Sequence, residues 1–129
     1  MAVTHTYTQT VTQAVGSTQT YTQAFTGDAE VNYSNAAFPI GTNALVPLST
    51  IPKNAATGLL AISFSSSTAA TVKVNSSGSP DVTITLAAGV PYIWTSTCGF
   101  ASPFTNPITS LYVTNAALTD LEIASVFTI

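Results

Sequence analysis

The sequence predicts an all-β protein: a single jelly-roll-like antiparallel β-sandwich preceded by an N-terminal β-hairpin or arm. Three observations support this class. No stretch of the chain shows the apolar period of 3.6 residues that an amphipathic helix requires. Short segments instead alternate apolar and polar residues, and Gly, Pro or Ser turns separate them every ~8–12 residues. A length of 129 residues suits one domain made of eight sandwich strands and a hairpin.

The first 26 residues predict a Thr/Gln-rich hairpin or arm. Threonine occupies every even position from 4 to 12, and the pattern resumes after a Gly-Ser break. Side chains two residues apart share one face of a strand, so these threonines form a row. A two-residue turn would mix the faces, whereas a three-residue loop at 16–18 keeps threonine opposite threonine and pairs Thr8 with Thr26. Neither face is strongly apolar, so the hairpin specifies its register weakly and favours pairing with something else.

The rest of the chain predicts the strands of the sandwich. Glycine, proline and asparagine interrupt residues 27–57, where we expect short strands near 29–34 and 43–48. The alternation is clear from residue 58 onwards, so 58–129 holds the best-defined sandwich strands. We expect these strands at 59–64, 71–75, 82–86, 91–94, 110–114 and 121–129. Residues 1–129 thus form a single domain.

The low charge of the chain excludes several classes of protein. Only 5% of the residues are charged, against about 25% in an average soluble protein, and the formal net charge is -3. Two isolated lysines cannot neutralise a phosphate backbone, so nucleic acid is not an expected partner. No run of ~20 apolar residues predicts a membrane span, and no basic start with an apolar stretch predicts a secretory signal.

The same low charge favours a component of an assembly. Net charge normally keeps soluble proteins apart. Here threonine and serine account for 37 of the 129 residues, so hydroxyls and amides must solvate most of the surface. A surface of this kind either tolerates association or uses it.

No group of side chains indicates catalysis, a metal centre or a cofactor. His5 is the only histidine and has no acidic residue nearer in sequence than Asp28, so we expect an exposed or partly buried strand residue. Cys98 lacks a neighbouring base or cation, which favours a small buried thiol. The two Asp-x-Glu pairs, which begin at Asp28 and Asp120, lack a calcium-loop motif and are typical of solvated strand ends. A weak cation site between subunits is the alternative for these pairs.

Two further binding functions rest on regular side-chain patterns. Tyr92 and Trp94 share a strand face and Phe100 follows soon after, which favours a carbohydrate- or receptor-binding patch. The competing interpretation is that Trp94 anchors the sandwich core. The Thr-x-Thr rows at 4–12 and 18–22 resemble those of ice-binding proteins, whose arrays need many stacked turns. Two rows make that function a remote alternative.

The sequence pattern of residues 58–129 resembles that of a known family. The chain reads DVTITLAAGVPYIW over 81–94, then Asn106-Pro107, and then SLYVTN over 110–115. This stretch resembles the small head decoration, or cement, proteins of tailed bacteriophages. Those chains are similar in length, rich in Thr, Ser and Ala, and folded as a jelly roll or related β-sandwich. Residues 1–26 lie outside the resemblance.

The resemblance implies a structural, non-enzymatic role on the outer capsid surface of a virion, after synthesis in the host cytoplasm. The expected partners are further copies of the chain, as a homodimer or homotrimer, and the major capsid protein of the same virion. A phage fibre tip or carbohydrate-binding module is the alternative role. We expect the contacts to involve the hairpin first and the proline-containing segment 35–57 second. The candidate interface residues are Thr4, Thr6, Thr8, Thr10, Thr12, Thr20, Thr22, Pro39, Pro47 and Pro52.

Overall fold

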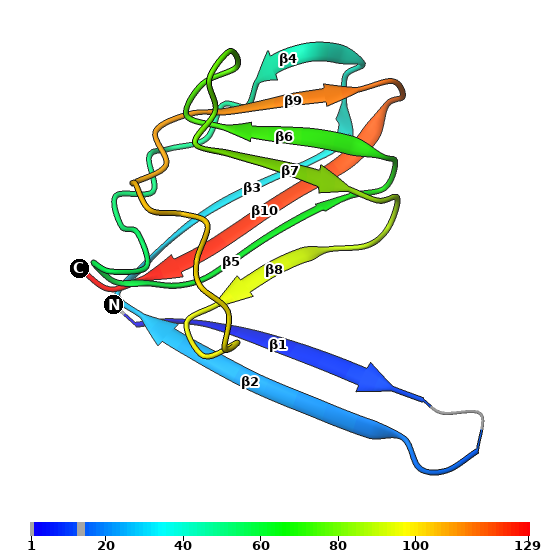
Figure 1. Cartoon of the computed structure of the whole chain (residues 1–129), viewed down its shortest axis with the longest axis vertical. Coiled ribbons are helices and arrows are strands. Elements are labelled where there is room, and N and C mark those ends of the chain that lie inside the picture. The colour runs from blue at the N-terminus through cyan, green and yellow to red at the C-terminus, as the bar shows by residue number, and fades with distance from the viewer. Residues whose placement is uncertain (1, 13–14) are drawn as a thin grey trace.

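The computed structural model describes residues 2–12 and 15–129, and its regular structure consists of β-strands (Figure 1). Within these ranges there is no helix, and so none that is long and apolar enough to cross a membrane. All strand pairs between named strands are antiparallel, and the predicted all-β class is confirmed. The strands are β1 (Val3–Val11), β2 (Gln19–Gly27), β3 (Ala29–Phe38), β4 (Gly41–Leu45), β5 (Leu59–Ser66), β6 (Ala70–Val74), β7 (Val82–Leu86), β8 (Tyr92–Thr95), β9 (Leu111–Asn115) and β10 (Thr119–Phe127).

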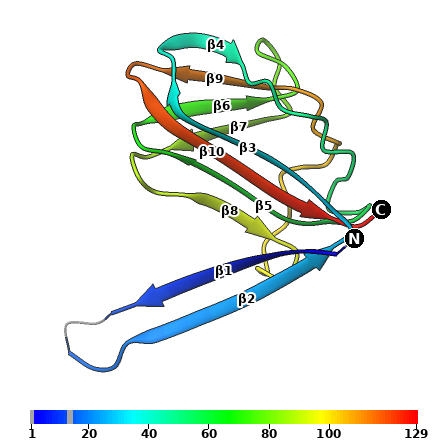
Figure 2. The same cartoon turned by 180° about the vertical axis from the view of Figure 1, so that it is seen from behind.

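Eight of these strands form two four-stranded sheets that pack face to face. One sheet has the order β3-β10-β5-β8 and the other has the order β4-β9-β6-β7. From β3 onwards every connection passes from one sheet to the other, except the turn that joins β6 to β7 (Figures 1 and 2). This strand connectivity is that of a jelly roll, as the sequence predicts.

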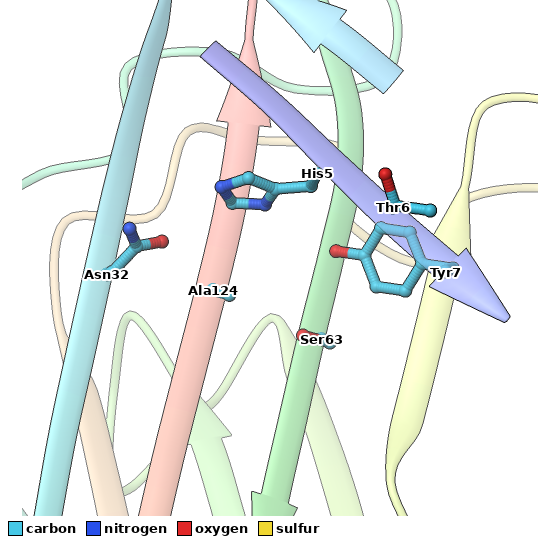
Figure 3. Close-up of a pocket in the computed structure, with 6 residues that line it drawn as sticks. All are labelled: His5, Thr6, Tyr7, Asn32, Ser63 and Ala124. Atoms are coloured by element: carbon cyan, nitrogen blue, oxygen red, sulfur yellow. The ribbon is translucent and has the colours of Figure 1, made fainter. Parts of the chain in front are cut away.

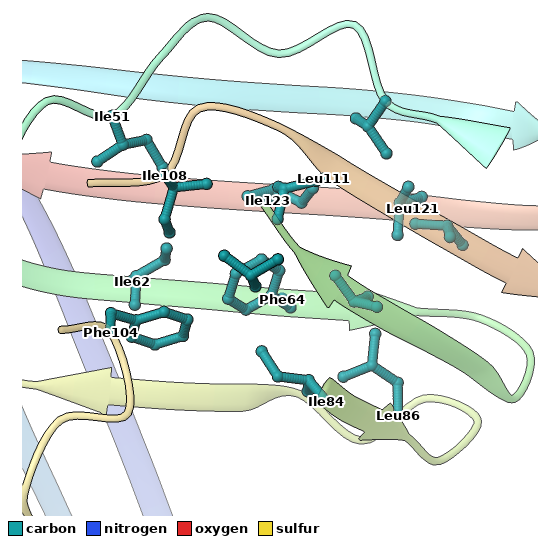
Figure 4. Close-up of a cluster of buried hydrophobic side chains, with 14 of the residues drawn as sticks. Ile51, Ile62, Phe64, Ile84, Leu86, Phe104, Ile108, Leu111, Leu121 and Ile123 are labelled. Carbon is teal, nitrogen blue, oxygen red and sulfur yellow. The ribbon is translucent and has the colours of Figure 1, made fainter. Parts of the chain in front are cut away.

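The core lies between the two sheets (Figure 4). It is formed by the inward-facing residues, which alternate with outward-facing residues along the strands of both sheets. Phe64 of β5 is fully buried and stacks on Phe104 with ring centroids 6.0 Å apart. Burying a side chain of this size contributes roughly 1.5–3 kcal/mol. The other side chains of this cluster with at most 3% exposure are Phe38, Val46, Ile51, Leu59, Ile62, Val72, Val74, Ile84, Leu86, Ile108, Leu111, Val113, Leu121 and Ile123.

The predicted strand positions hold with one clear difference in the proline-containing segment. We expected short strands near 29–34 and 43–48, but β3 continues to Phe38 and β4 spans Gly41–Leu45. The reason is tertiary pairing, because β3 follows β10 as far as the Thr119–Phe38 pair, beyond a register shift. The strand that the sequence favours is therefore lengthened by its neighbour.

The hairpin of β1 and β2 forms a separate two-stranded sheet, but its predicted register is wrong. Thr8 pairs with Thr22 rather than with Thr26, a shift of four residues that still keeps threonine opposite threonine. The strands join through residues 12–18 rather than through a three-residue loop. The expected alternation beyond Val11 falls partly on Gln13 and Ala14, which lie outside the described residues.

A second, smaller apolar cluster attaches the root of the hairpin to the outer face of the β3-β10-β5-β8 sheet. Phe25 of β2 is 6% exposed and lies against Ala61 of β5 and Val126 of β10. Tyr7 of β1 packs on Phe25 edge to face, with ring centroids 5.9 Å apart. These contacts decide the register, because the predicted pairing would have placed Phe25 opposite Gln9 instead of His5. Beyond this root the hairpin extends away from the sandwich (Figures 1 and 2).

We expect Gly27→Ala to destabilise the junction between hairpin and sandwich. A Cβ at Gly27 would lie 2.5 Å from the carbonyl oxygen of Phe127 and 2.9 Å from a methyl group of Val126, so the backbone must shift. Overpacking of this kind costs about 1–3 kcal/mol, which thermal unfolding and hydrogen exchange in β2 will measure. Gly78→Ala is the matched control, since its Cβ meets nothing within 4 Å. Equal melting of the two variants would contradict the close approach at Gly27.

Candidate functional site

The predicted threonine row forms the outward face of the hairpin. Alternation along β1 places the even-numbered residues opposite the face that carries Tyr7 and Phe25, and the even-numbered threonines of both strands are exposed. Hydroxyl oxygens of facing threonines lie 2.8 Å apart for Thr4 and Thr26 and 3.4 Å apart for Thr8 and Thr22. Six of the seven predicted threonines, Thr4, Thr6, Thr8, Thr10, Thr20 and Thr22, belong to the two strands, and Thr12 follows β1 as an exposed residue.

The three predicted prolines are exposed, but they lie in a different part of the molecule. Pro39 lies between β3 and β4, while Pro47 and Pro52 lie in the segment between β4 and β5. All three belong to the connections of the sandwich rather than to the hairpin. The structure therefore divides the candidate interface residues into a threonine face and separate proline-containing loops.

Polar side chains reinforce the root of the hairpin, where β1 crosses the outer face of the sheet (Figure 3). The His5 Nε2 atom lies 2.7 Å from Oε2 of Glu30 on β3, and the His5 side chain is only 14% exposed. A hollow of about 270 Å³ lies beside this pair and is lined by His5, Thr6, Tyr7, Asn32, Ser63 and Ala124. His5 thus has an acidic partner, as its position in the sequence did not suggest, and the pair connects β1 to β3.

Burial and hydrogen bonding shift two pKa values at this root. The hydrogen bond with His5, and then one with Asn32, lowers the pKa of Glu30 below its ordinary value of 4.5. Burial raises the pKa of Tyr7, an effect that the Ser63 hydroxyl partly offsets. Both shifts favour a charged Glu30 and a neutral Tyr7 near neutral pH, which is the arrangement that docks the hairpin.

The aromatic residues proposed as a ligand patch do not share one exposed surface. Trp94 is 6% exposed, belongs to the core cluster, and donates its Nε1–H to the carbonyl of Phe100 at 3.3 Å. Tyr92 is half-buried against Phe64 and Phe104. Only Phe100, which is 80% exposed, faces solvent freely.

Cys98 and the acidic pairs take local structural roles. Cys98 is half-buried rather than buried, and hydrogen bonds with the backbone of Phe100 and Thr95 lower the pKa of its thiol. The Asp28 carboxylate accepts the backbone N–H of Ile129 at 3.0 Å, and Glu122 accepts a hydrogen bond from Ser34 at 3.4 Å. In residues 2–12 and 15–129 no three His, Cys, Asp or Glu side chains come together as metal ligands.

A groove of about 1000 Å³ separates the hairpin from β8 and the loops that flank it. The hairpin wall is formed by Tyr7, Thr8, Gln9, Thr20, Tyr21, Thr22, Gln23 and Phe25, and the sandwich wall by Val90, Pro91, Ile93, Thr95, Cys98 and Phe100. Four of these side chains expose large apolar surfaces: Tyr21 (62%), Val90 (57%), Ile93 (44%) and Phe100 (80%). None of the lining residues is a lysine, arginine, aspartate or glutamate.

Of the four exposed apolar residues of the groove, sequence reasoning proposed only Phe100 as a site residue and missed Tyr21, Val90 and Ile93. The one available signal was that Tyr21 is an aromatic residue among the polar residues of the distal part of β2. Nothing in the sequence indicates that the 90–100 region lies across from the hairpin, because that proximity arises only when the hairpin docks. The groove combines exposed apolar surface with a concave shape.

Comparisons with known proteins returned no match among protein-family models, curated proteins or solved structures.

We expect the docking of the hairpin to weaken in acid. Because the pKa of Glu30 is lowered in the folded state, its contribution is fully present above pH 4.5 and is lost as the pH falls below that value. Chemical shifts of the Tyr7 and Phe25 rings between pH 7 and pH 3 will report the change. Glu30→Gln is expected to abolish it, whereas Glu122→Gln, on the sandwich, is expected to retain it. Identical titrations of wild type and Glu30→Gln would contradict this role.

We also expect opposite outcomes at two aromatic residues close in sequence. Trp94→Ala removes a core side chain and is expected to lower the free energy of unfolding by about 3–5 kcal/mol. Phe100→Ala removes an exposed ring and is expected to change it by less than about 0.5 kcal/mol. Chemical denaturation measures both values. A small effect at Trp94 would count against its place in the core.

Proposed function

We propose that this chain is a non-enzymatic structural protein of a tailed-phage virion that decorates or cements the outside of the capsid. The expected partners are further copies of the chain, as a homodimer or homotrimer, and the major capsid protein. The single observation that carries this proposal is the uncharged hairpin, which is anchored at its root and extends from a closed sandwich with both outer edges unpaired.

An isolated two-stranded hairpin is marginally stable in water, so one that protrudes this far gains from a partner. The outer edges of β1 and β2 carry backbone N–H and C=O groups that a strand of another protein can pair with. The threonine face adds neutral hydroxyl groups, which form hydrogen bonds without the cost of removing ions from water. The hairpin is therefore suited to protein–protein contact.

A capsid favours a partner of this kind because it repeats the same binding site many times. An oligomer that holds several capsid subunits at once gains affinity through multivalency without needing a tight single contact. The sandwich provides the base of the hairpin. The sequence pattern of residues 58–129 resembles that of tailed-phage decoration proteins, and the whole chain is similar to them in length and composition. These points support the capsid surface as the location.

A carbohydrate- or receptor-binding module, such as a fibre tip, is the second candidate. The exposed rings of Tyr21 and Phe100 in an uncharged groove favour it, because aromatic faces stack on sugars. The burial of Trp94 counts against the patch that the sequence predicted. Loss of glycan-array binding in Phe100→Ala, with the fold intact, would support this candidate over decoration.

The test of the proposal is a trimmed hairpin that preserves its root. Residues 8–22 are replaced by an Asn-Gly turn between Tyr7 and Gln23, which pair across the hairpin. Co-sedimentation with capsids that lack this protein is expected to fall at least about tenfold in affinity, while the sandwich still melts cooperatively. Full-length protein that does not bind capsids, or a trimmed variant that binds equally well, would overturn the proposal.

A further inference from the structure

We propose that the groove between the hairpin and β8 receives the β1–β2 hairpin of a second copy of this chain. This inference rests on the self-association included in the proposed function and names the surface that performs it. The two parts of the contact are the groove defined above and the distal hairpin, residues 9–11 and 19–21.

The groove presents apolar surface that no other part of the chain covers. Ile93 on β8 and Phe100 beyond it are 44% and 80% exposed, and Tyr21 lies across from them at 62% exposure. Soluble proteins rarely leave large apolar side chains gathered in one concave place unless something binds there. β8 is also an edge strand, since it pairs with β5 alone, so its outer backbone groups are open to a neighbour.

The distal hairpin is also largely uncovered, because its two strands pair with each other but bury no side chain there. Every described residue from 8 to 24 is exposed, including Val11 at 41% and Tyr21 at 62%. Burial begins only at the root, with Phe25 and Gly27. The hairpin thus carries apolar side chains and two free strand edges into solvent, and a groove of matching chemistry would cover both.

Charge favours a second copy as the occupant. All acidic residues and both lysines of the chain lie outside the groove lining and outside β1 and β2. Two copies with a net charge of -3 can therefore meet here without placing like charges against each other. A partner with a charged segment would instead leave an ion buried and unpaired, which is costly.

The area of a reciprocal contact reaches that of a stable dimer. The exposed part of the hairpin is about five residues long on each strand, or ~17 Å, and two paired strands are ~10 Å wide, so each face of this part covers about 170 Å². When each copy places its hairpin in the groove of the other, both faces of both hairpins and the surfaces opposite them are buried. The total, roughly 1,000–1,400 Å², lies at the lower end of the range of specific interfaces. Such an exchange is isologous, so it closes on itself and forms a discrete dimer.

Sedimentation velocity over a concentration series tests the contact with one variant on each side. Phe100→Glu places a charge in the groove at a side chain exposed enough to leave the fold intact, and Val11→Glu does so on the hairpin outside the lining of its own groove. Each is expected to weaken self-association by at least about tenfold. Leu45→Glu is the matched control, because the exposure of Leu45 (61%) lies between those of Val11 and Phe100 but Leu45 belongs to β4 of the other sheet, and it is expected to associate like wild type. Ile93→Thr, which adds no charge, is a second groove variant.

Mixing the two variants distinguishes this exchange from any other dimer. The Val11→Glu copy retains an intact groove and the Phe100→Glu copy retains an intact hairpin, so the mixture can make one of the two contacts. We expect association to return in the mixture, when one variant is fluorescently labelled, although neither variant associates alone. A mixture that remains monomeric, or groove variants that associate like wild type, would overturn the inference.

Capsid co-sedimentation of the same variants separates this inference from the proposed function. Wild-type protein that is monomeric up to ~100 µM yet binds capsids would overturn the groove contact and leave decoration standing. Self-association that depends on the groove, without capsid binding, would support the contact and overturn decoration. Groove variants that lose glycan or capsid binding while self-association is unchanged would assign the groove to that other ligand and overturn the inference.

Discussion

The chain passes from the hairpin into the sandwich at Gly27, where the backbone lies so close to the end of β10 that no side chain fits. The next residue, Asp28, donates its backbone N–H to the carbonyl of Phe127 at 2.9 Å, and its carboxylate accepts the N–H of Ile129. These contacts fasten the start of β3 to the end of the chain. The direction in which the hairpin leaves the sandwich depends on these contacts of Gly27 and Asp28. The contacts between the hairpin and the sandwich depend on that direction in turn.

Two apolar clusters of unequal size stabilise different parts of the fold. The large cluster between the sheets contains buried residues from seven of the eight sandwich strands, with Ala44 of β4 packed against it, and it holds the jelly roll together. The small cluster around Phe25, Ala61 and Val126 lies on the outer face of one sheet and holds only the root of the hairpin. Because the two clusters are separate, the hairpin can change its contacts without disturbing the core. This separation suits a segment whose partner lies outside the chain.

The low charge of the chain determines which contacts its surface can make. In the described ranges, 2–12 and 15–129, the one contact within 4.0 Å between a basic and an acidic side chain is the hydrogen bond of His5 with Glu30 at the root of the hairpin. Hydroxyl groups occupy the outward face of the hairpin, and the groove is lined by uncharged side chains, both polar and apolar. Both surfaces can therefore contact an uncharged partner. A protein with a highly charged surface could make neither contact without removing ions from water.

The sequence by itself determined the class of fold, because strand alternation is a local property of neighbouring residues. It indicated the ten strands and the threonine face. The predicted pairing of threonine with threonine also holds, because a register shift of four residues preserves the alternation. It did not determine the hairpin register, since neither face of residues 3–26 is apolar enough to select one. Only the docking of Phe25 and Tyr7 on the sheet decided that register. The same docking placed His5 beside Glu30 and opened the groove opposite Ile93 and Phe100, because these proximities join residues far apart in the chain and arise only in the folded structure.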